Sequence, residues 1–198
     1  MDTRLERYRG PLLTRSLSDA LHAARAAGQP GLRASFDLGR SEAEAVLHAN
    51  DWTLHDTRYP WPGELKDRTL YWFDGVEFSA ASRFAGALIK LVPTDWGAPT
   101  FEIDGIKMLP TAKLSPVEDA RRKVELVQPR GKRLLDTCGG LGYFAACALE
   151  QGAAQILSFE KNPSVHWLRG LNPWSPDPDS AEAAGRLELR QGDVSLAI

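Results

Sequence analysis

The fold of this chain is decided by Leu134-Leu135-Asp136-Thr137-Cys138-Gly139-Gly140-Leu141-Gly142-Tyr143-Phe144-Ala145, followed by Ile156-Leu157-Ser158-Phe159-Glu160. Two apolar segments each end in an acidic residue, and a glycine-rich turn and a helical segment lie between them. Strand, glycine turn, helix and strand in this order are typical of half of a nucleotide-cofactor cleft. The sequence therefore predicts a ligand site at the carboxyl ends of parallel strands.

Strands and helices are expected to alternate from residue 132 to the end of the chain. Alternation at this spacing predicts an α/β fold with a parallel, doubly wound sheet, of which the chain holds a part. The expected strands are 133–137, 155–159 and 187–191, and the expected helices are 142–150 and 163–171.

A helix that follows Ser115 is expected to open this C-terminal part. Serine is a good N-cap, Pro116 suits the first turn, Glu118 stands at the capping-box position, and Pro129 ends the helix. We place the domain boundary just before it. The expected domains are an N-terminal helix plus a small β-rich domain over 1–112, and half of a Rossmann-like domain over 113–198.

The N-terminal part is rich in β-forming residues and turns. An Ala-rich helix over 18–27 precedes them, and the Asp-Gly pairs at 74–75 and 104–105 suit two-residue hairpin turns. Four of the six tryptophans lie here, namely Trp52, Trp61, Trp72 and Trp96. We expect them to fill a small core, and the alternative is a surface for a partner or substrate.

The composition is that of a globular protein with no global charge for binding nucleic acid or a membrane. A hydrophobic content of 43% is enough for a buried core, and 24 basic against 26 acidic residues give no field that would attract nucleic acid or an anionic membrane. The sequence has no run of about 18 apolar residues, and residues 1–7 lack the apolar core of a signal peptide, so we expect a cytoplasmic protein. The histidines and cysteines lack metal-ligand spacing, and no metal site is expected.

Asp136 decides between two kinds of nucleotide cofactor. The turn from Gly140 also fits the dinucleotide fingerprint G-x-G-x-x-G/A, with Glu160 twenty residues further on. In a dinucleotide fold Asp136 would lie inside the buried first strand, where a carboxylate without a partner is costly. At the end of the strand it can instead meet the ammonium and sulfonium groups of S-adenosylmethionine (SAM). We favour SAM over a nicotinamide or flavin nucleotide, and a third interpretation is that the acids only cap helices.

At these residues the sequence resembles the class I SAM-dependent methyltransferases. Their first motif is acid-x-G-x-G-x-G at the end of the first strand, and Asp136, Gly140 and Gly142 match it by position. Cys138 replaces the first glycine, which requires a backbone conformation that a non-glycine residue tolerates.

The same resemblance assigns roles to the ends of the next two strands. It implies that Glu160 accepts hydrogen bonds from the ribose hydroxyls, that the stem of Lys161 lies against adenine, and that Asp193 accepts from the adenine amino group. The expected cofactor-binding residues are Asp136, Cys138, Gly139, Gly140, Gly142, Glu160, Lys161 and Asp193.

A closer resemblance is to a group of predicted methyltransferases that are common in archaea and related in layout to spermidine synthases. Those proteins place a β-rich region before Gly-Ile-Lys-Met-type and Pro-x-Glu-Asp-type segments, which are residues 105–108 and 116–119 here. A motif like Leu-Asp-Thr-Cys-x-Gly-Leu-Gly-Tyr spans 135–143, and the segments 160–163 and 172–175 follow. The resemblance implies methyl transfer from SAM to an acceptor that it does not identify.

Two other functions stay open at this point. A spermidine-synthase-like aminopropyltransferase would use decarboxylated SAM, and a non-catalytic SAM-binding or interaction module would use the β-rich domain for its work. No catalytic residue is assigned, because the residues that position the acceptor usually follow the fourth strand of such sheets.

The family resemblance also predicts an incomplete sheet. Class I methyltransferases order their strands 3-2-1-4-5-7-6, and the present sequence ends at Ile198, just after the third. The strand 133–137 would then be an apolar edge that is prone to association. We expect either a fragment of a longer protein or a second chain, such as another copy, that completes the sheet.

Asn172-Pro173-Trp174 is similar to the Asn-Pro-Pro-Tyr type motif with which amino-group methyltransferases hold a planar nitrogen. That motif follows the fourth strand, whereas Asn172 follows a helix and precedes the third strand. We therefore expect Asn172 at the opposite end of the sheet from the cofactor, as a helix stop with Trp174 packed beside it.

Overall fold

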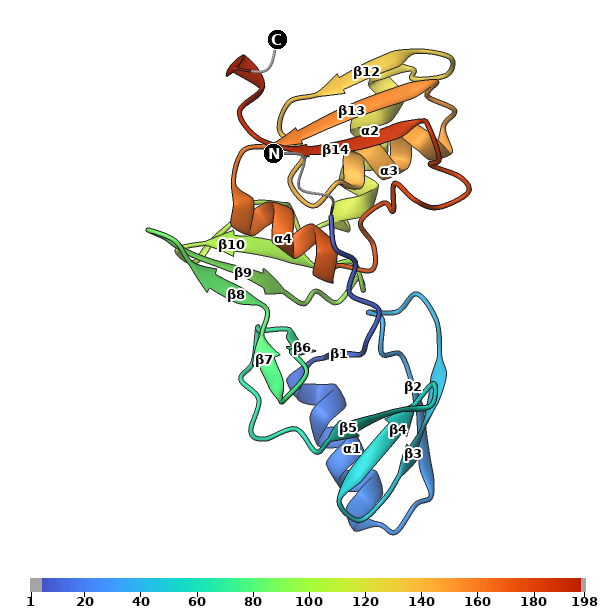
Figure 1. The fold of residues 1–198 in the computed structure, drawn as a ribbon, viewed down its shortest axis with the longest axis vertical. Coiled ribbons are helices and arrows are strands. Elements are labelled where there is room, and N and C mark those ends of the chain that lie inside the picture. Colours follow the sequence, from blue (N-terminus) through green and yellow to red (C-terminus); the bar gives the residue numbers. More distant parts are fainter. Residues whose placement is uncertain (1–4, 197–198) are drawn as a thin grey trace.

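The computed structural model describes residues 5–196 as a mixed α/β protein (Figure 1). Its described strands form three antiparallel sheets before residue 108 and one parallel sheet of three strands after residue 132. The helices of residues 5–196 include none that is long and apolar enough to cross a membrane.

The lower part of the molecule in Figure 1 is one helix packed against a four-stranded antiparallel sheet of order β2-β3-β4-β5. Its elements are α1 (Arg15–Ala26), β2 (Gly31–Ala34), β3 (Ala43–Leu47), β4 (Asp51–Leu54) and β5 (Thr57–Pro60). The helix begins before the expected residue 18, because Thr14 is the N-cap and its hydroxyl accepts a hydrogen bond from the Leu17 N–H at 3.1 Å.

Trp52 is the centre of the core in this lower part. It is fully buried, and its ring stacks on Phe36 at 5.4 Å and on Phe78 at 6.0 Å between ring centroids. The expectation that the tryptophans fill a core is confirmed for Trp52. Trp96 does not fill a core, because 48% of its surface is exposed.

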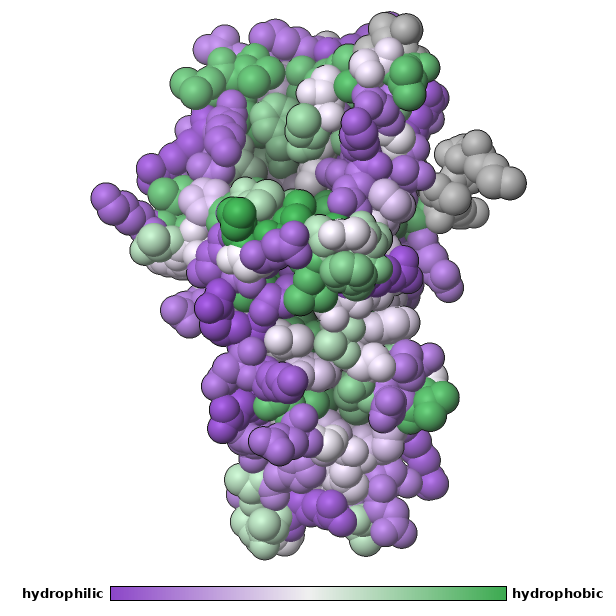
Figure 2. Space-filling view, turned by 90° about the vertical axis from the view of Figure 1, so that its left-hand side faces the viewer, coloured by the Kyte–Doolittle hydropathy of each residue, from purple (hydrophilic) through white to green (hydrophobic). Residues whose placement is uncertain are grey.

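Two further antiparallel sheets, of order β1-β6-β7 and β11-β10-β9-β8, connect the lower part to the parallel sheet. Their strands are β1 (Leu12–Leu13), β6 (Tyr71–Phe73), β7 (Phe78–Ala80), β8 (Ser82–Phe84), β9 (Leu88–Val92), β10 (Thr100–Ile103) and β11 (Ile106–Lys107). Apolar side chains gather over the β8–β11 sheet in the middle of the face seen in Figure 2. Exposed apolar residues of this region are Phe84, Leu88, Ile106 and Met108.

The two Asp-Gly pairs form different turns. Ile103 pairs with Ile106, and Asp104 and Gly105 both have positive φ (48° and 81°), so this two-residue turn is confirmed. The loop between β6 and β7 holds four residues, 74–77, because Phe73 pairs with Phe78. The expectation of a two-residue turn is wrong there, since the Asp74 carboxylate accepts from the Val76 and Glu77 N–H groups, both at 2.9 Å.

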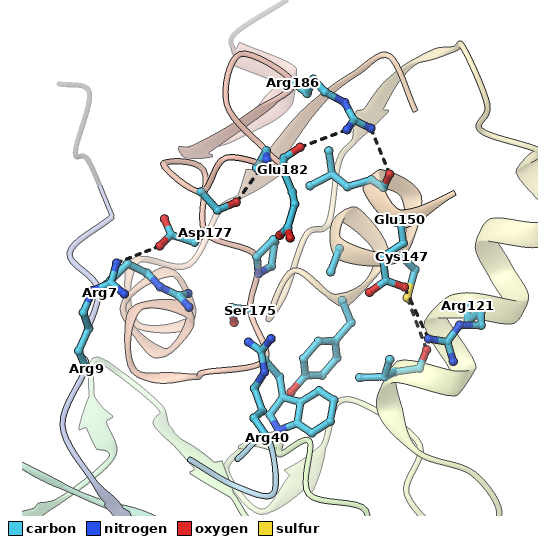
Figure 3. A pocket seen from close by; sticks show the side chains of 18 residues that line it. Arg7, Arg9, Arg40, Arg121, Cys147, Glu150, Ser175, Asp177, Glu182 and Arg186 are labelled. Atoms are coloured by element: carbon cyan, nitrogen blue, oxygen red, sulfur yellow. Dashed lines mark hydrogen bonds and ion pairs between the residues drawn. The ribbon is translucent and has the colours of Figure 1, made fainter. Parts of the chain in front are cut away.

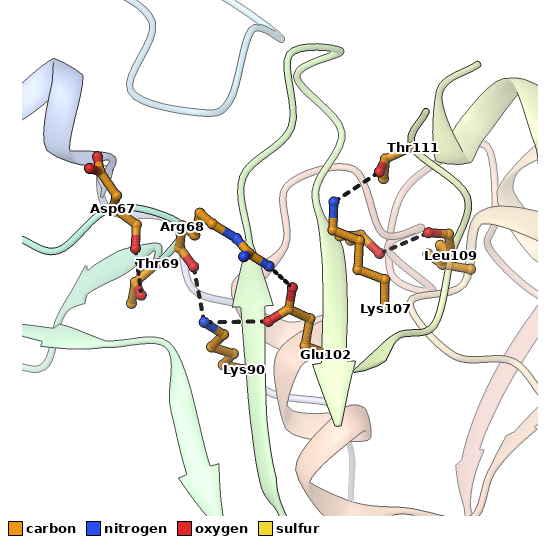
Figure 4. Close-up of polar contacts among 9 residues, drawn as sticks. Asp67, Arg68, Thr69, Lys90, Glu102, Lys107, Leu109 and Thr111 are labelled. Atoms are coloured by element: carbon orange, nitrogen blue, oxygen red, sulfur yellow. Dashed lines mark hydrogen bonds and ion pairs between the residues drawn. The ribbon is translucent and has the colours of Figure 1, made fainter. Parts of the chain in front are cut away.

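A buried carboxylate ties the segment before β6 to the β9–β10 pair. Glu102 on β10 is only 2% exposed, and its oxygens lie 2.5 Å from Arg68 Nη2 and 3.4 Å from Lys90 Nζ (Figure 4). Two cations therefore compensate the one buried charge.

The C-terminal part follows the predicted alternation. Its elements are α2 (Pro116–Val127), β12 (Arg133–Asp136), α3 (Tyr143–Glu150), β13 (Gln155–Glu160), α4 (Pro163–Leu171), β14 (Leu187–Gln191) and a 3₁₀ turn at Val194–Leu196. The strands are parallel and ordered β12-β13-β14, with Leu135 opposite Leu157 and Ile156 opposite Leu187.

The parallel sheet is covered unequally on its two faces. On β14, Leu187 and Leu189 are buried, whereas Glu188 and Arg190 on the other face are exposed. Within the described residues β12 pairs only with β13, and Leu135 on it is 47% exposed. The described structure therefore shows a small parallel sheet with one well-packed face and an edge at β12.

The larger hydrophobic core crosses the expected boundary between residues 112 and 113. Leu91 and Phe101 of the antiparallel sheet share it with Val124 of α2, Ile156 of β13 and Leu168 of α4. Helix α4 lies between the parallel sheet and strands β9 and β10 (Figure 1). The antiparallel sheet thus helps to position the segments that surround the glycine turn.

Candidate cofactor site

The glycine turn between β12 and α3 has the backbone shape that its sequence requires. Gly140 and Gly142 have φ of 49° and 84°, in the left-handed region that favours glycine, and Gly142 is the N-cap of α3. Cys138 does not have a positive φ. The replacement of the first glycine of the motif by Cys138 is therefore compatible with this turn.

Gly139 is required for a different reason, because its surroundings leave no space for a side chain. A Cβ atom at this position would lie 1.8 Å from Arg169 Nη2 and 2.3 Å from Ser158 Oγ. These side chains lie against the backbone at a distance that only glycine allows.

Arg169 on α4 is fully buried behind the turn and was not predicted from the sequence. Its Nε donates a hydrogen bond to the Gly140 carbonyl oxygen, and its Nη2 lies 3.4 Å from Ser158 Oγ. Burial lowers the pKa of Arg169, and the nearby Glu160 and Asp136 carboxylates oppose this effect. The sequence does contain a signal for this role, namely an arginine among the apolar residues of α4. A charge that is buried with them needs hydrogen-bond partners nearby.

Asp136 is connected to this arginine through a serine. Ser158 Oγ on β13 donates a hydrogen bond to Asp136 Oδ2 at 2.8 Å, and the two residues are paired in register across β12 and β13. Asp136 is the last residue of β12 and is partly exposed. Its carboxylate therefore stands at the carboxyl end of the strand, as expected.

Glu160 brings the end of β13 to the glycine turn. Its Oε2 accepts a hydrogen bond from the Gly140 N–H at 2.9 Å, and its Oε1 accepts from the Asn162 N–H at 2.8 Å. Asn162 itself caps α4, since its side-chain oxygen accepts from the Ser164 N–H at 2.9 Å. Glu160 thus has a structural role in the turn as well as a partly exposed carboxylate.

Lys161 and Asp193 form an ion pair at the rim of this region. Lys161 Nζ lies 2.8 Å from Asp193 Oδ2, and Ser195 donates to Asp193 Oδ1 from its N–H and its hydroxyl. The hydrogen bond from Lys161 and those from Ser195 lower the pKa of Asp193 to about 2. The chain returns to β13 just before Asp193, because the Gly192 N–H donates to the Glu160 carbonyl at 2.9 Å.

The expected position of Asn172 is wrong. Its side-chain nitrogen donates to Tyr143 Oη at 3.0 Å and to Ser175 Oγ at 2.9 Å, and Tyr143 is the first residue of α3, directly after the glycine turn. Asn172 therefore lies near the turn and not at the opposite end of the sheet. It does end α4, it is fully buried, and Trp174 packs partly against the larger core.

Three carboxylates lie at the ends of the parallel strands. Asp136 ends β12, Glu160 ends β13 and Asp193 follows β14, and their oxygens can accept from hydroxyl and amino donors or attract cations. The turn that follows Asp136 has glycine at 139, 140 and 142, and the side chain of Leu141 between them is buried. Cys138 is exposed beside the turn.

Comparison with known proteins identifies a relative whose activity is not described. No family model matches the chain. The uncharacterized protein MJ1233 of Methanocaldococcus jannaschii is 44% identical over 105 residues, which are 52% of this chain and 35% of that protein. The similarity thus spans about a third of the length of that relative.

Proposed function

We propose that this chain is the cofactor-binding N-terminal portion of a SAM-dependent methyltransferase, built on part of a Rossmann-like, doubly wound sheet. The observation that supports this most is the 2.9 Å hydrogen bond from the Gly140 N–H to Glu160 Oε2. It holds the acid that ends the second strand against the turn that follows the first, at the carboxyl ends of the strands, where open α/β sheets bind ligands.

SAM would supply a methyl group on a positively charged sulfur, to which an acceptor lone pair bonds in line as the carbon–sulfur bond breaks and the neutral thioether S-adenosylhomocysteine leaves. The residues of this chain would hold and orient the donor. Glu160 would accept hydrogen bonds from the ribose hydroxyls, Asp136 would face the cationic part, and Asp193 would accept from the adenine amino group while Lys161 lies alongside. Alignment of donor and acceptor supplies much of the acceleration in such a displacement, so no general base is assigned.

Calorimetric titration with SAM of the wild-type chain and of Glu160→Gln tests this proposal. Loss of a charge-assisted contact is expected to weaken binding by about 1–3 kcal/mol, or roughly 5- to 150-fold. Glu188→Gln is the matched control, because Glu188 is an exposed acid on β14 that pairs with Arg190. Equal SAM affinity in the wild type and Glu160→Gln would show that the ribose assignment is wrong.

Product analysis with putrescine and either SAM or decarboxylated SAM distinguishes methyl transfer from aminopropyl transfer. A methylated product formed with SAM would support the methyltransferase. Aminopropylated putrescine formed with decarboxylated SAM would favour the aminopropyltransferase.

A further inference from the structure

A cavity beside α3 lies apart from the eight expected cofactor residues, none of which lines it. Its volume is about 750 Å³, which is within the range of small-molecule sites. It is bounded by α2, α3, the segment that follows α4, and two segments near the N-terminus (Figure 3). Its floor along α3 and α2 is largely apolar and includes Tyr143, Ala146, Leu149 and Val117.

Three arginines from distant parts of the sequence converge at one end of this cavity. Arg7 and Arg9 come from the N-terminal segment and Arg40 from the loop before β3 (Figure 3). Their known contacts are mostly with neutral groups. Arg7 Nη1 donates to the Arg169 carbonyl at 3.1 Å, and Arg40 donates to the Pro173 carbonyl and lies over the Trp174 ring.

The carboxylates near this cluster do not neutralise it. Arg9 forms an ion pair with Asp177 at 3.2 Å, whereas within residues 5–196 neither Arg7 nor Arg40 has a carboxylate oxygen within 4.0 Å. Burial lowers the pKa of Arg7, Asp177 opposes this, and the nearby Arg9 and Arg40 lower it further. A half-buried guanidinium beside two others is a position at which an anion would be stabilising.

The other two arginines at the cavity, Arg186 and Arg121, have partners of their own. Arg186 donates to the Leu149 and Ala153 carbonyls at 3.1 and 2.7 Å, and Arg121 lies 3.6 Å from Glu150. In all, five arginines and three acids line the cavity; the acids are Glu150, Asp177 and Glu182. Arg9 pairs with Asp177, Arg121 with Glu150, and Arg186 donates to main-chain carbonyls, so within residues 5–196 the guanidinium groups of Arg7 and Arg40 keep their charge without a carboxylate partner.

We propose that this cavity binds a small organic phosphate. The guanidinium groups of Arg7, Arg9 and Arg40 hold the phosphate, because arginine presents a fork of donors that matches phosphate oxygens. The apolar floor along α3 receives the organic body of the ligand. This inference does not depend on the proposed cofactor site, since the two sites share no residue.

Calorimetry of the full chain at low ionic strength with phenyl phosphate, inorganic phosphate and phenol tests the proposal. We expect one phenyl phosphate per chain, weaker binding of inorganic phosphate and no binding of phenol. Arg7→Gln and Arg40→Gln are each expected to weaken phenyl phosphate binding at least tenfold. Arg9→Gln gives a second test at a largely exposed residue whose loss should not affect folding.

Arg58→Gln is the matched control, because Arg58 on β5 is exposed and pairs at 3.8 Å with Asp51, far from the cavity. Thermal unfolding of each variant shows whether it is folded. Two results would overturn the proposal. One is the absence of saturable phenyl phosphate binding up to about 10 mM. The other is binding that Arg7→Gln, Arg9→Gln and Arg40→Gln all leave unchanged.

Discussion

The Nε atom of Arg169 donates a hydrogen bond to the main-chain carbonyl of Gly140, so a residue near the end of α4 holds the turn that follows β12. The main-chain carbonyl of Arg169 in turn accepts from Arg7 Nη1 at 3.1 Å. The glycine turn is therefore supported from behind by a buried cation, while Glu160 at the end of β13 accepts a hydrogen bond from the Gly140 N–H.

Replacing this cation is expected to destabilise the protein. Arg169→Met keeps an unbranched apolar stem but leaves the Gly140 carbonyl without its donor, and we expect a loss of roughly 2–4 kcal/mol in the free energy of unfolding. Urea denaturation measures this loss. Arg122→Met, at an exposed arginine of α2, is the control and should change stability by less than about 0.5 kcal/mol. Equal effects of the two substitutions would contradict a supporting role for Arg169.

Gly139→Ala tests the close approach of the same side chain. The new methyl group would meet Arg169 Nη2 and Ser158 Oγ, both of which are hydrogen-bonded, so we expect a loss of about 1–3 kcal/mol. Gly63→Ala is the matched control, because a Cβ there has no atom within 4 Å and its φ is not positive. Thermal unfolding of both variants should show a lower midpoint for Gly139→Ala alone.

The local pattern was enough to predict the strands, the glycine turn and the helices of the C-terminal part. Each of these depends on residues close together in the chain, such as Asp136 before Gly140 and Asn162 before α4. The position of Asn172 was not predictable in this way, because α4 packs against β9 and its end lies beside Tyr143. A rule based on strand order alone placed it at the wrong end of the sheet.

The partners of Arg169 also depend on tertiary packing. Twenty-nine residues separate it from Gly140, and no spacing rule connects a helix residue to that carbonyl. For the same reason the sequence did not predict that Phe101 and Leu91 would share a core with α4. The hairpin at Asp74 differed from its expected form because the Asp74 side chain, and not the main chain alone, closes the loop.

The two cysteines are expected to differ in reactivity. Cys138 is exposed, whereas Cys147 is buried on α3, and burial together with Glu150 raises its pKa to about 11. Iodoacetamide at pH 8 should therefore label Cys138 in the native protein and Cys147 only after unfolding, which mass spectrometry of the peptides can measure. The raised pKa contributes stability below pH 9.0, and this contribution is lost as the pH rises through about 11. Equal labelling rates in the native state would contradict the buried position of Cys147.

Glu102→Ala should destabilise the antiparallel sheet moderately. The carboxylate is buried, but Arg68 is 65% and Lys90 21% exposed, so water can solvate both cations after its removal. We expect a loss of about 1–3 kcal/mol by urea denaturation, less than for a fully buried pair. Glu42→Ala removes an exposed ion pair with Arg33 and should cost no more than about 1 kcal/mol. A smaller loss in Glu102→Ala than in this control would contradict the account.

The carboxylates at the ends of β12, β13 and β14 are proposed to form a site for SAM. Calorimetric titration of the purified chain with SAM, and separately with NAD, tests this assignment. We expect one SAM bound per chain and no binding of NAD. Binding of NAD without binding of SAM would contradict the interpretation of Asp136, and with it the proposed methyltransferase.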